Sequence, residues 1–352
     1  MATIEAEKYP SEAGEITYIR VTNSRGRSVL LSSLGAGIVG VQVPDKSGKI
    51  ENICLAYADA KDYLHDAPTM GKTAGRYANR ICEGKLRIDG QDYQLAVNCG
   101  PHHLHGGPEG FQNKIWDVEL LSNGVRFSYL SPDGDENYPA ELKVAVEYRW
   151  SDDNELSISF EAVADAPTVV NLTNHAYWNL DGADSGNALH HEVKMKASRW
   201  LPTDSTLAPT GEYAEVKDTP MDFTEFKAVG QELEEDFPAL KYGKGYDNCW
   251  VLDGGRADGK EEMIRDAVVM RSPESGRELH IDTDQPGVQL YSGNWLAGSP
   301  LNRSGRSYQD YEGIAIEAQG FPDAPNHPEF PSQSVDPANP YRRTIIYRFL
   351  PL

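Results

Sequence analysis

Hydrophobic and polar residues alternate along several long stretches of this chain. The period of two is clearest over residues 125–130, 142–150 and 156–163. Successive side chains of a β-strand point to opposite faces of a sheet, so each segment offers one face to a core and the other to solvent or a second sheet. We therefore predict that all three segments are strands of an antiparallel sheet.

Similar segments recur between turn signals over the rest of the chain. Further strands are predicted at residues 17–22, 28–31, 35–44, 53–56, 263–270, 278–282, 287–291, 313–317 and 343–349. Residues 86–95 predict a β-hairpin, and one short helix is predicted over residues 225–237, with the acidic run 231–236 on its solvated face. Strands about 8–12 residues apart, separated by turns, indicate an all-β fold with a large antiparallel β-sandwich or barrel and few short helices.

The chain is long enough to bury a large core. It has 352 residues, of which 39% are hydrophobic, and its 32 glycines and 22 prolines are spread along the whole length. All-β folds of this size often form one domain, and no linker or internal repeat interrupts the pattern. We expect a single domain over residues 1–352.

The formal net charge of -21 narrows the range of partners. A strongly acidic surface disfavours DNA, RNA and anionic membranes, and no stretch of about 18 apolar residues predicts a membrane span. The first ten residues carry charges where a signal peptide needs an apolar run, so we expect a cytoplasmic protein. Cys54, Cys82, Cys99 and Cys249 form no CxxC pair, which favours reduced thiols.

The segment Asn171–Leu180 carries the first sign of chemistry. It contains three asparagines, one histidine (His175) and two aromatic residues, directly after a mostly apolar run. The pKa of histidine lies near neutrality, so this side chain can give or take a proton at working pH. Aromatic faces and amides suit a sugar pocket, because they match its C–H faces and its hydroxyls. The segment indicates proton chemistry on a polyhydroxylated small molecule.

Three further segments place polar side chains on loops or at a strand end. His102, His103 and His105 lie beside glycines on a loop; they are candidate metal ligands, but no nearby cysteine or helical histidine pair completes a site, and satisfied loop histidines are the alternative. The arginines of residues 75–81 could grip hydroxyls or form ordinary ion pairs. Glu317 ends an apolar strand, where it could be a base of raised pKa or cap a turn.

Taken together, these segments resemble the aldose 1-epimerase (galactose mutarotase) family over nearly the whole chain, from about Ile16 to Phe349. Each motif is weak alone, whereas seven in the family's order are specific. The motifs are Gly75–Ile81, Leu104–Gly107, Asn171–Trp178, Pro202–Asp204 with Pro209–Gly211, Gly245–Asp247, Gln285–Gln289 with Gly293-Asn294, and Glu317–Gln319 with Pro322–Ala324. The resemblance implies a supersandwich of large antiparallel sheets.

The resemblance also implies an activity, the interconversion of α and β anomers of free aldohexoses such as galactose and glucose. A base removes the proton of the C1 hydroxyl, an acid protonates the ring oxygen, and the ring opens, rotates about C1–C2 and closes again. This chemistry requires no metal, nucleotide or other cofactor. The partner is a free monosaccharide, and we expect a monomer or homodimer.

Individual roles follow from the family's motifs. Glu317 is the implied base, His175 the acid, and His105 a donor near the ring oxygen. The implied substrate-binding residues are Arg80, Asn79, Asp247 and Gln289, while Trp178 packs nearby. Three departures from the family pattern leave the preferred sugar open: His102 where relatives often have asparagine, Asn248 where they often have histidine, and Ala140 where the residue after the proline is usually glycine. The loops 183–187 and 254–261 either shape the cleft or lie at the surface.

Three alternatives compete with this activity. An epimerase of hexose 6-phosphates or substituted sugars would need extra Arg or Lys near the pocket. A non-catalytic sugar-binding module would not need the acid–base set of Glu317, His175 and His105. A glycoside hydrolase would need two paired carboxylates at the scissile bond, and the sequence offers one good candidate.

Overall fold

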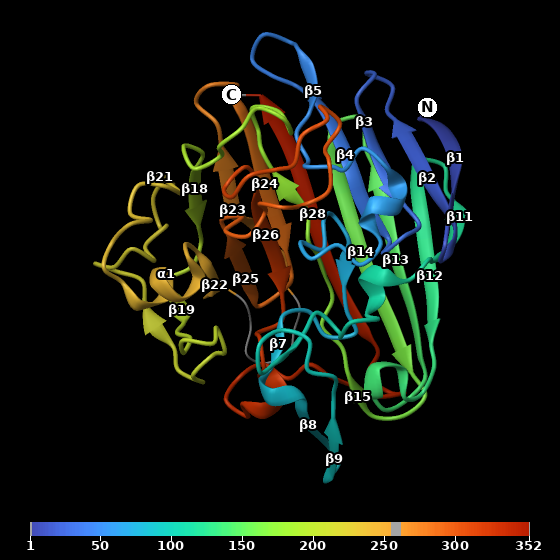
Figure 1. Cartoon of the computed structure of the whole chain (residues 1–352), viewed down its shortest axis with the longest axis vertical. Coiled ribbons are helices and arrows are strands. Elements are labelled where there is room, and N and C mark those ends of the chain that lie inside the picture. Colours follow the sequence, from blue (N-terminus) through green and yellow to red (C-terminus); the bar gives the residue numbers. More distant parts are fainter. Residues whose placement is uncertain (1, 255–261, 352) are drawn as a thin grey trace.

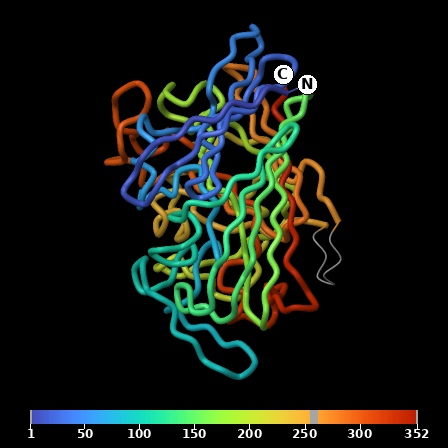
Figure 2. The backbone as a smooth tube through the Cα atoms, turned by 90° about the vertical axis from the view of Figure 1, so that its right-hand side faces the viewer, coloured from blue at the N-terminus to red at the C-terminus, as the bar shows by residue number. Residues whose placement is uncertain are grey.

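The computed structural model describes residues 2–254 and 262–351, and large antiparallel sheets dominate it (Figure 1). Neighbouring strands of the nine-stranded sheet are β11 (Asp117–Leu120), β12 (Gly124–Ser131), β13 (Leu142–Trp150), β14 (Glu155–Ala164), β28 (Tyr341–Pro351), β24 (Arg277–Thr283), β23 (Ile264–Arg271), β18 (Glu192–Met195) and β21 (Lys227–Ala228). Figure 2 shows the long strands β12 to β14 and β28 running side by side along the molecule.

Two other sheets complete the architecture. The six-stranded sheet has the order β17 (Tyr177–Trp178), β26 (Ile314–Gln319), β25 (Gly287–Tyr291), β22 (Asp247–Val251), β19 (Arg199–Leu201) and β20 (Ala214–Glu215). The five-stranded sheet consists of β1 (Thr3–Ser11), β2 (Gly14–Thr22), β3 (Ser28–Ser32), β4 (Gly37–Pro44) and β5 (Ile50–Asn52). The predicted all-β sandwich is therefore confirmed.

Four short two-stranded ladders add to the three large sheets in the described residues. They pair β6 (Thr73–Ala74) with β16 (Thr173–Asn174), β7 (Arg80–Ile81) with β10 (His103–Leu104), β8 (Lys85–Ile88) with β9 (Gln91–Gln94), and β15 (Thr168–Val169) with β27 (Ser334–Val335). The β8–β9 pair is the predicted hairpin, and it projects from one end of the molecule (Figure 1). The short 3-10 helices are Ala60–Tyr63, Cys82–Gly84, Phe111–Asn113, Asp135–Asn137 and Ala324–Asn326.

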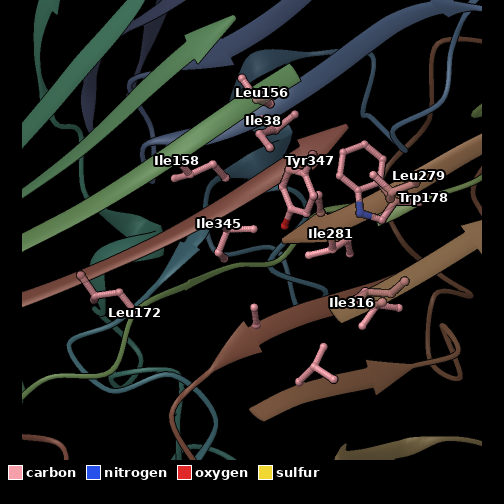
Figure 3. Close-up of a cluster of buried hydrophobic side chains, with 14 of the residues drawn as sticks. Ile38, Leu156, Ile158, Leu172, Trp178, Leu279, Ile281, Ile316, Ile345 and Tyr347 are labelled. Carbon is pink, nitrogen blue, oxygen red and sulfur yellow. The ribbon is translucent and has the colours of Figure 1, made fainter. Parts of the chain in front are cut away.

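The principal hydrophobic core lies between the sheets. Side chains from β4, β14, β17, β24, β26 and β28 meet there, together with Leu172 from the segment before β16, and Figure 3 labels ten of the core residues. Ile158 and Ile345 face each other across β14 and β28, and Tyr347 lies opposite both Leu156 and Ile281. Burial of these apolar side chains is the main force that holds the layers together.

Most predicted strands are confirmed within one or two residues, but the predicted helix over residues 225–237 is wrong. Lys227-Ala228 instead pairs with β18 as β21, and the only α-helix in the described ranges is α1 (Pro238–Gly243). Gly230 packs its backbone against Leu189, and repulsion within the acidic run 231–236 disfavours a helix. Pro238 occupies the first turn of α1, a position that proline tolerates well.

Two smaller differences concern the N-terminal sheet. Residues 53–56 were expected to be a strand, whereas β5 ends at Asn52 and Cys54 forms only an isolated bridge to Trp178. The edge strand β1 had not been predicted, because its exposed, charged residues carry little hydrophobic signal. No helix among the described residues has the length and apolar character needed to cross a membrane.

Core packing predicts a large stability difference between two sites on β14. Ile158 is fully buried, whereas Val163 is 50% exposed. We expect Ile158→Ala to lower the free energy of unfolding by about 2–5 kcal/mol, because it leaves a cavity in the core. The matched Val163→Ala change should stay within about 0.5 kcal/mol. Urea denaturation of both variants measures the difference, and equal effects would contradict this description of the core.

Candidate active site

A cavity of about 280 Å³ opens beside the six-stranded sheet. Its polar side chains come from segments that are far apart in the sequence, and its rim is largely apolar. The lining consists of Ala67, Pro68, Thr69, Asn79, Arg80, Cys99, Leu104, His105, His175, Tyr177, Leu207, Asp247, Tyr291, Trp295 and Glu317. Six of the seven residues assigned to the site from sequence therefore face one cavity.

Alternation along three neighbouring strands brings the acidic residues together. On β26, Ile314, Ile316 and Ala318 belong to the main core, so Glu317 projects from the opposite face. Gln289 on β25 lies directly opposite Glu317 in the ladder. One face of the six-stranded sheet therefore lines the cavity, and its other face packs on the core.

Gln289 is the one predicted site residue that does not line the cavity. Its side-chain amide donates to Asp247 Oδ1 over 2.7 Å, and its Oε1 is buried without a hydrogen-bond partner among the described residues. Asp247 Oδ2 in turn lies 3.6 Å from Arg80 Nη2. Gln289 thus holds the Asp247 carboxylate, which faces the cavity. Asp247 and Arg80 together form the polar end of the cavity.

His175 is fixed by its backbone on both sides. Its N–H donates to the Lys72 carbonyl and its own carbonyl accepts from the Gly71 N–H, both over 2.9 Å. Its Nε2 lies 3.4 Å from Glu317 Oε1, and its Nδ1 is buried without a partner among the described residues. An imidazole and a carboxyl group are therefore adjacent at the floor of the cavity.

The backbone around His105 determines which of its nitrogens carries the proton. The Asn79 N–H donates to His105 Nδ1 over 3.1 Å, so Nδ1 is an acceptor, and the hydrogen of the neutral ring must sit on Nε2. His105 has φ of +50° and Asn79 has φ of +63°, both in the sparsely populated left-handed region. A Cβ on the next residue, Gly106, would lie 1.9 Å from the Gly75 carbonyl oxygen, so this loop requires glycine.

Burial shifts the titration of all three groups at the floor. It lowers the pKa of His175 to about 4 and that of His105 well below its usual value. Burial raises the pKa of Glu317 well above its usual value; the negative charge of Asp247 raises it further, while Arg80 opposes the rise. Each shift disfavours the charged form of a group removed from water.

Arg80 is the first residue of β7, and Asn79 directly precedes the strand. Asn79 Oδ1 accepts the Arg80 N–H over 2.8 Å, which leaves the Asn79 amide N–H₂ available to the cavity. Arg80 lies opposite Leu104 in the β7–β10 ladder, and this pairing carries the arginine beside the loop of His105. Arg80 is 7% exposed, so its guanidinium reaches the cavity from a buried position.

Several cavity residues were not assigned from sequence. The rings of Tyr177 and Tyr291 lie 4.9 Å and 6.3 Å from that of His175, and Trp295, 60% exposed, stands at the rim. The signal that could have found Tyr291 is its position two residues after Gln289 on a strand, which places both on one face. Nothing comparable marks Leu207, whose loop has no regular structure.

The asparagines of the 171–180 segment have structural roles, contrary to the expectation that their amides would bind a sugar. Asn171 bonds the backbone of Ala78 and Gly320, Asn174 bonds Gly71, and Asn179 bonds Gly186 and Glu312. Trp178 is fully buried and packs on Tyr347, as expected of a residue that only packs nearby.

Of the three histidines considered as metal ligands, His102 and His103 are already engaged in other contacts. His103 contacts the Ala96 carbonyl and the Tyr138 hydroxyl, and His102 accepts from the Glu83 N–H and contacts Thr206, so both nitrogens of each ring are occupied. Ligand atoms of His105, His175 and Glu317 do lie within 4.8 Å of one another. This trio is the proposed proton-transfer set, and His105 has only Nε2 left to offer.

The departures from the family pattern lie outside the floor of the cavity. Asn248 is 1% exposed and alternates with Asp247, so it projects away from the cavity, and His102 does not belong to the lining. The 183–187 loop does not line the cavity, and residues 255–261 of the second loop lie outside the described residues. All four cysteines are free.

Comparisons with known proteins agree along the whole length. The family model described as aldose 1-epimerase matches residues 17–348. The galactose mutarotases of Sus scrofa and Homo sapiens are each 39% identical over 340 residues, which cover 97% of this chain and 96% of each relative. The aldose 1-epimerase of Escherichia coli is 35% identical over 335 residues, 94% of either chain.

Solved structures show the same fold. An aldose epimerase homologue from C. elegans superposes with a TM-score of 0.86 at 33% identity, covering 95% of this chain and 99% of that one. A galactose 1-epimerase from Lactobacillus acidophilus gives a TM-score of 0.85 at 28% identity, with 100% and 99% covered. Sequence, fold and full-length coverage together show that the chain belongs to the aldose 1-epimerase family.

Proposed function

We propose that this protein is an aldose 1-epimerase that interconverts the α and β anomers of free aldohexoses such as galactose and glucose. The contact between Glu317 and His175, 3.4 Å apart in one cavity, carries this proposal. The two oxygens that exchange protons, the C1 hydroxyl and the ring oxygen, are bonded to the same carbon. A base and an acid that serve them must therefore lie side by side, each within hydrogen-bond reach of its own oxygen.

The proton transfers are written as follows. Because burial favours the uncharged pair, the proton first passes from Glu317 to His175 across their contact. The Glu317 carboxylate then takes the proton of the C1 hydroxyl while the His175 imidazolium gives its proton to the ring oxygen. The C1–O5 bond breaks, and the sugar becomes the open aldehyde. Rotation about C1–C2 presents the other carbonyl face, and the reverse transfers close the ring and restore both side chains.

The pair consequently needs only one proton. Ring opening converts carboxylate and imidazolium into carboxylic acid and neutral imidazole, and ring closure reverses the change. The net charge of the pair stays at zero throughout, which suits a floor where both side chains are nearly inaccessible to water. Because side chains supply every transfer, we propose a reaction without metal, nucleotide or covalent intermediate.

The surrounding residues position the sugar. His105 offers a fixed Nε2–H, which we place near the ring oxygen to stabilise negative charge that develops there. Asp247 accepts from sugar hydroxyls while Arg80 and the Asn79 amide donate to them. Tyr177, Tyr291 and Trp295 give the apolar surface that the C–H faces of a pyranose need.

Two observations favour a neutral hexose over the alternatives. Arg80 is the only Lys or Arg that lines the cavity, within the described part of the chain, and it faces Asp247, so a phosphate group finds no free cation there. Asp247 and Glu317 share the cavity, but Gln289 and Arg80 hold Asp247 at its polar end, where it suits hydroxyl binding rather than hydrolysis.

The free cysteines fit a reducing cytoplasm.

The decisive experiment is polarimetry on freshly dissolved α-D-glucose and α-D-galactose, with the spontaneous rate subtracted. We expect the wild-type protein to accelerate the rotation change and Glu317→Gln to lose at least about 10²-fold in kcat, the scale of a lost proton-transfer group, while sugar still binds. Glu161→Gln on the distant nine-stranded sheet is the matched control and should leave the rate unchanged. A fully active Glu317→Gln variant would refute the base assignment.

The pH profile of kcat/KM tests how Asp247 acts on the base. Glu317 and His175 titrate as a pair, so the limbs of the profile belong to both groups. The charge of Asp247 raises the pKa of Glu317. Asp247→Asn should therefore lower the pKa of the pair and move the profile to lower pH, in addition to weakening sugar binding. A profile that moves to higher pH or keeps its position would contradict this electrostatic assignment.

The same burial predicts a stability cost of the base. The folded-state pKa of Glu317 lies above its usual value of 4.5, so the folded protein binds more protons than the unfolded chain, and stability falls as pH rises from about that value through the folded-state pKa. Glu317→Gln removes this cost. In sugar-free urea denaturation we expect the variant to exceed the wild type by about 1 kcal/mol or more at pH 8, with the difference shrinking towards pH 4.5. A less stable variant at pH 8 would be inconsistent with a desolvated base.

A further inference from the structure

A second cavity, of about 620 Å³, lies against the five-stranded sheet. Its lining includes residues of β1 and β2 together with Tyr57 and Arg303, and it shares no residue with the active-site cavity. The volume falls within the range of about 300–1,000 Å³ typical of small-molecule sites. Nothing in the proposed reaction uses this cavity.

One wall of the second cavity is aromatic. The rings of Tyr9 and Tyr18 lie 5.0 Å apart at 56°, and Leu30 lies beside them in the lining. Tyr18 is 9% exposed, and its hydroxyl oxygen is buried without a hydrogen-bond partner among the described residues. Buried hydroxyls are nearly always paired, so this one indicates a partner from water or a ligand.

The other notable feature is a pair of available cations. The Arg20 guanidinium makes one hydrogen bond, to Ser28 Oγ over 3.3 Å, and Arg20 lies opposite Glu5 in the β1–β2 ladder. Within the described ranges neither Arg20 nor Arg303 has a carboxylate oxygen within the 4.0 Å of an ion pair. Two arginines without a close ion pair are uncommon in a chain with 54 acidic and 33 basic residues, and the lining places them beside the carboxylates of Glu5, Glu7 and Asp59. Both guanidinium charges oppose the upward pKa shift of Tyr9, so they lie close to the aromatic wall.

Acidic side chains in the lining of the second cavity determine which further ligand groups it can bind. Glu7 accepts from the Tyr9 hydroxyl, and Glu5 and Asp59 are exposed at the cavity. Carboxylates accept hydrogen bonds from sugar hydroxyls, whereas guanidinium groups bind phosphates and carboxylates in a fork. An aromatic wall with both kinds of group matches a ligand that is hydroxylated on one part and anionic on another.

We propose that this second cavity binds a monosaccharide that carries an anionic group, phosphate or carboxylate. The anionic group lies on Arg20 and Arg303, and the pyranose lies against Tyr9 and Tyr18. The active-site cavity cannot serve the same ligand equally well, because its single arginine faces Asp247.

Isothermal titration calorimetry with sugars that have no free anomeric hydroxyl tests this site independently of any turnover. The probes are α-D-glucose 1-phosphate, methyl β-D-glucuronide, methyl α-D-glucoside and inorganic phosphate. We expect at least one of the first two to bind, and both the neutral glucoside and phosphate alone to bind at least about tenfold more weakly. The glucose phosphate and the glucuronide distinguish phosphate from carboxylate as the preferred anion.

Variants locate the bound probe. Arg20→Ala and Arg303→Ala should each weaken binding about tenfold or more, the scale of a lost charge-assisted hydrogen bond. Lys8→Ala is the matched control, because Lys8 lies on β1 between Glu7 and Tyr9 but projects from the opposite face and pairs with Glu15. It should bind the probe normally, and circular dichroism and melting temperature verify that all variants fold.

Three binding results would overturn the proposal, and the Asp247→Asn variant supplies a fourth. The first three are failure of both anionic sugars to bind, binding that folded Arg20→Ala and Arg303→Ala variants retain in full, and binding as tight for inorganic phosphate as for the sugars. Asp247→Asn should leave probe binding unchanged. If it weakens binding as much as the arginine variants do, the probe occupies the active-site cavity, and the proposal is wrong. These outcomes do not depend on whether the protein epimerises aldoses.

Discussion

The removal of Glu317 and His175 from water is the constraint on which the rest of the site depends. A carboxylate and an imidazolium are costly to bury, and neither His175 Nδ1 nor Glu317 Oε2 has a hydrogen-bond partner among the residues that the structure describes. The cost is bearable because the pair stays neutral overall as its proton moves. Burial also raises the pKa of Glu317 well above its usual value and lowers that of His175 to about 4, so the uncharged pair of carboxylic acid and imidazole is favoured at rest. Stability at this position is given up for reactivity.

Such a pair works only if the backbone holds it, and the six-stranded sheet itself carries Glu317, whereas His175 lies between β16 and β17. β26 lies inside the six-stranded sheet, where Ile316 and Ala318 anchor one face in the core and fix Glu317 on the other. His175 is tied to the 71–72 segment, next to the ladder between β6 and β16. The short β6–β16 ladder thus fixes the backbone position of His175, although His175 itself lies on a loop.

The fold was predictable from sequence where side chains alternate clearly, as in β12 to β14, because one buried face specifies both strand and register. Prediction failed where tertiary contacts outweigh local preference. Residues 225–237 carry helix-forming glutamates, yet Lys227-Ala228 completes the edge of a sheet. The edge strand β1 has too few apolar residues to show a period. Neither outcome is encoded in a short window of sequence.

The residues of the candidate site also fall into those that the sequence predicts and those that it does not. Glu317, His175 and Asp247 stand in motifs that resemble a family, and the motifs locate them without any model of the fold. Leu207 and Trp295 reach the cavity only through loop geometry, which no residue pattern encodes. The asparagines show the converse, because a composition suited to a sugar pocket was used to pair backbone groups that strands leave open.

The wall between the two cavities explains how one loop can be rigid enough for catalysis. Tyr57 lines the second cavity and donates to Asp66, which forms a buried ion pair with Lys72. Residues 67–69, between these partners, line the active site, and the Lys72 carbonyl holds His175. A buried pair of this kind contributes more to a unique geometry than to net stability. A ligand bound beside Tyr57 therefore affects His175 only to the extent that it displaces the ion pair between Asp66 and Lys72.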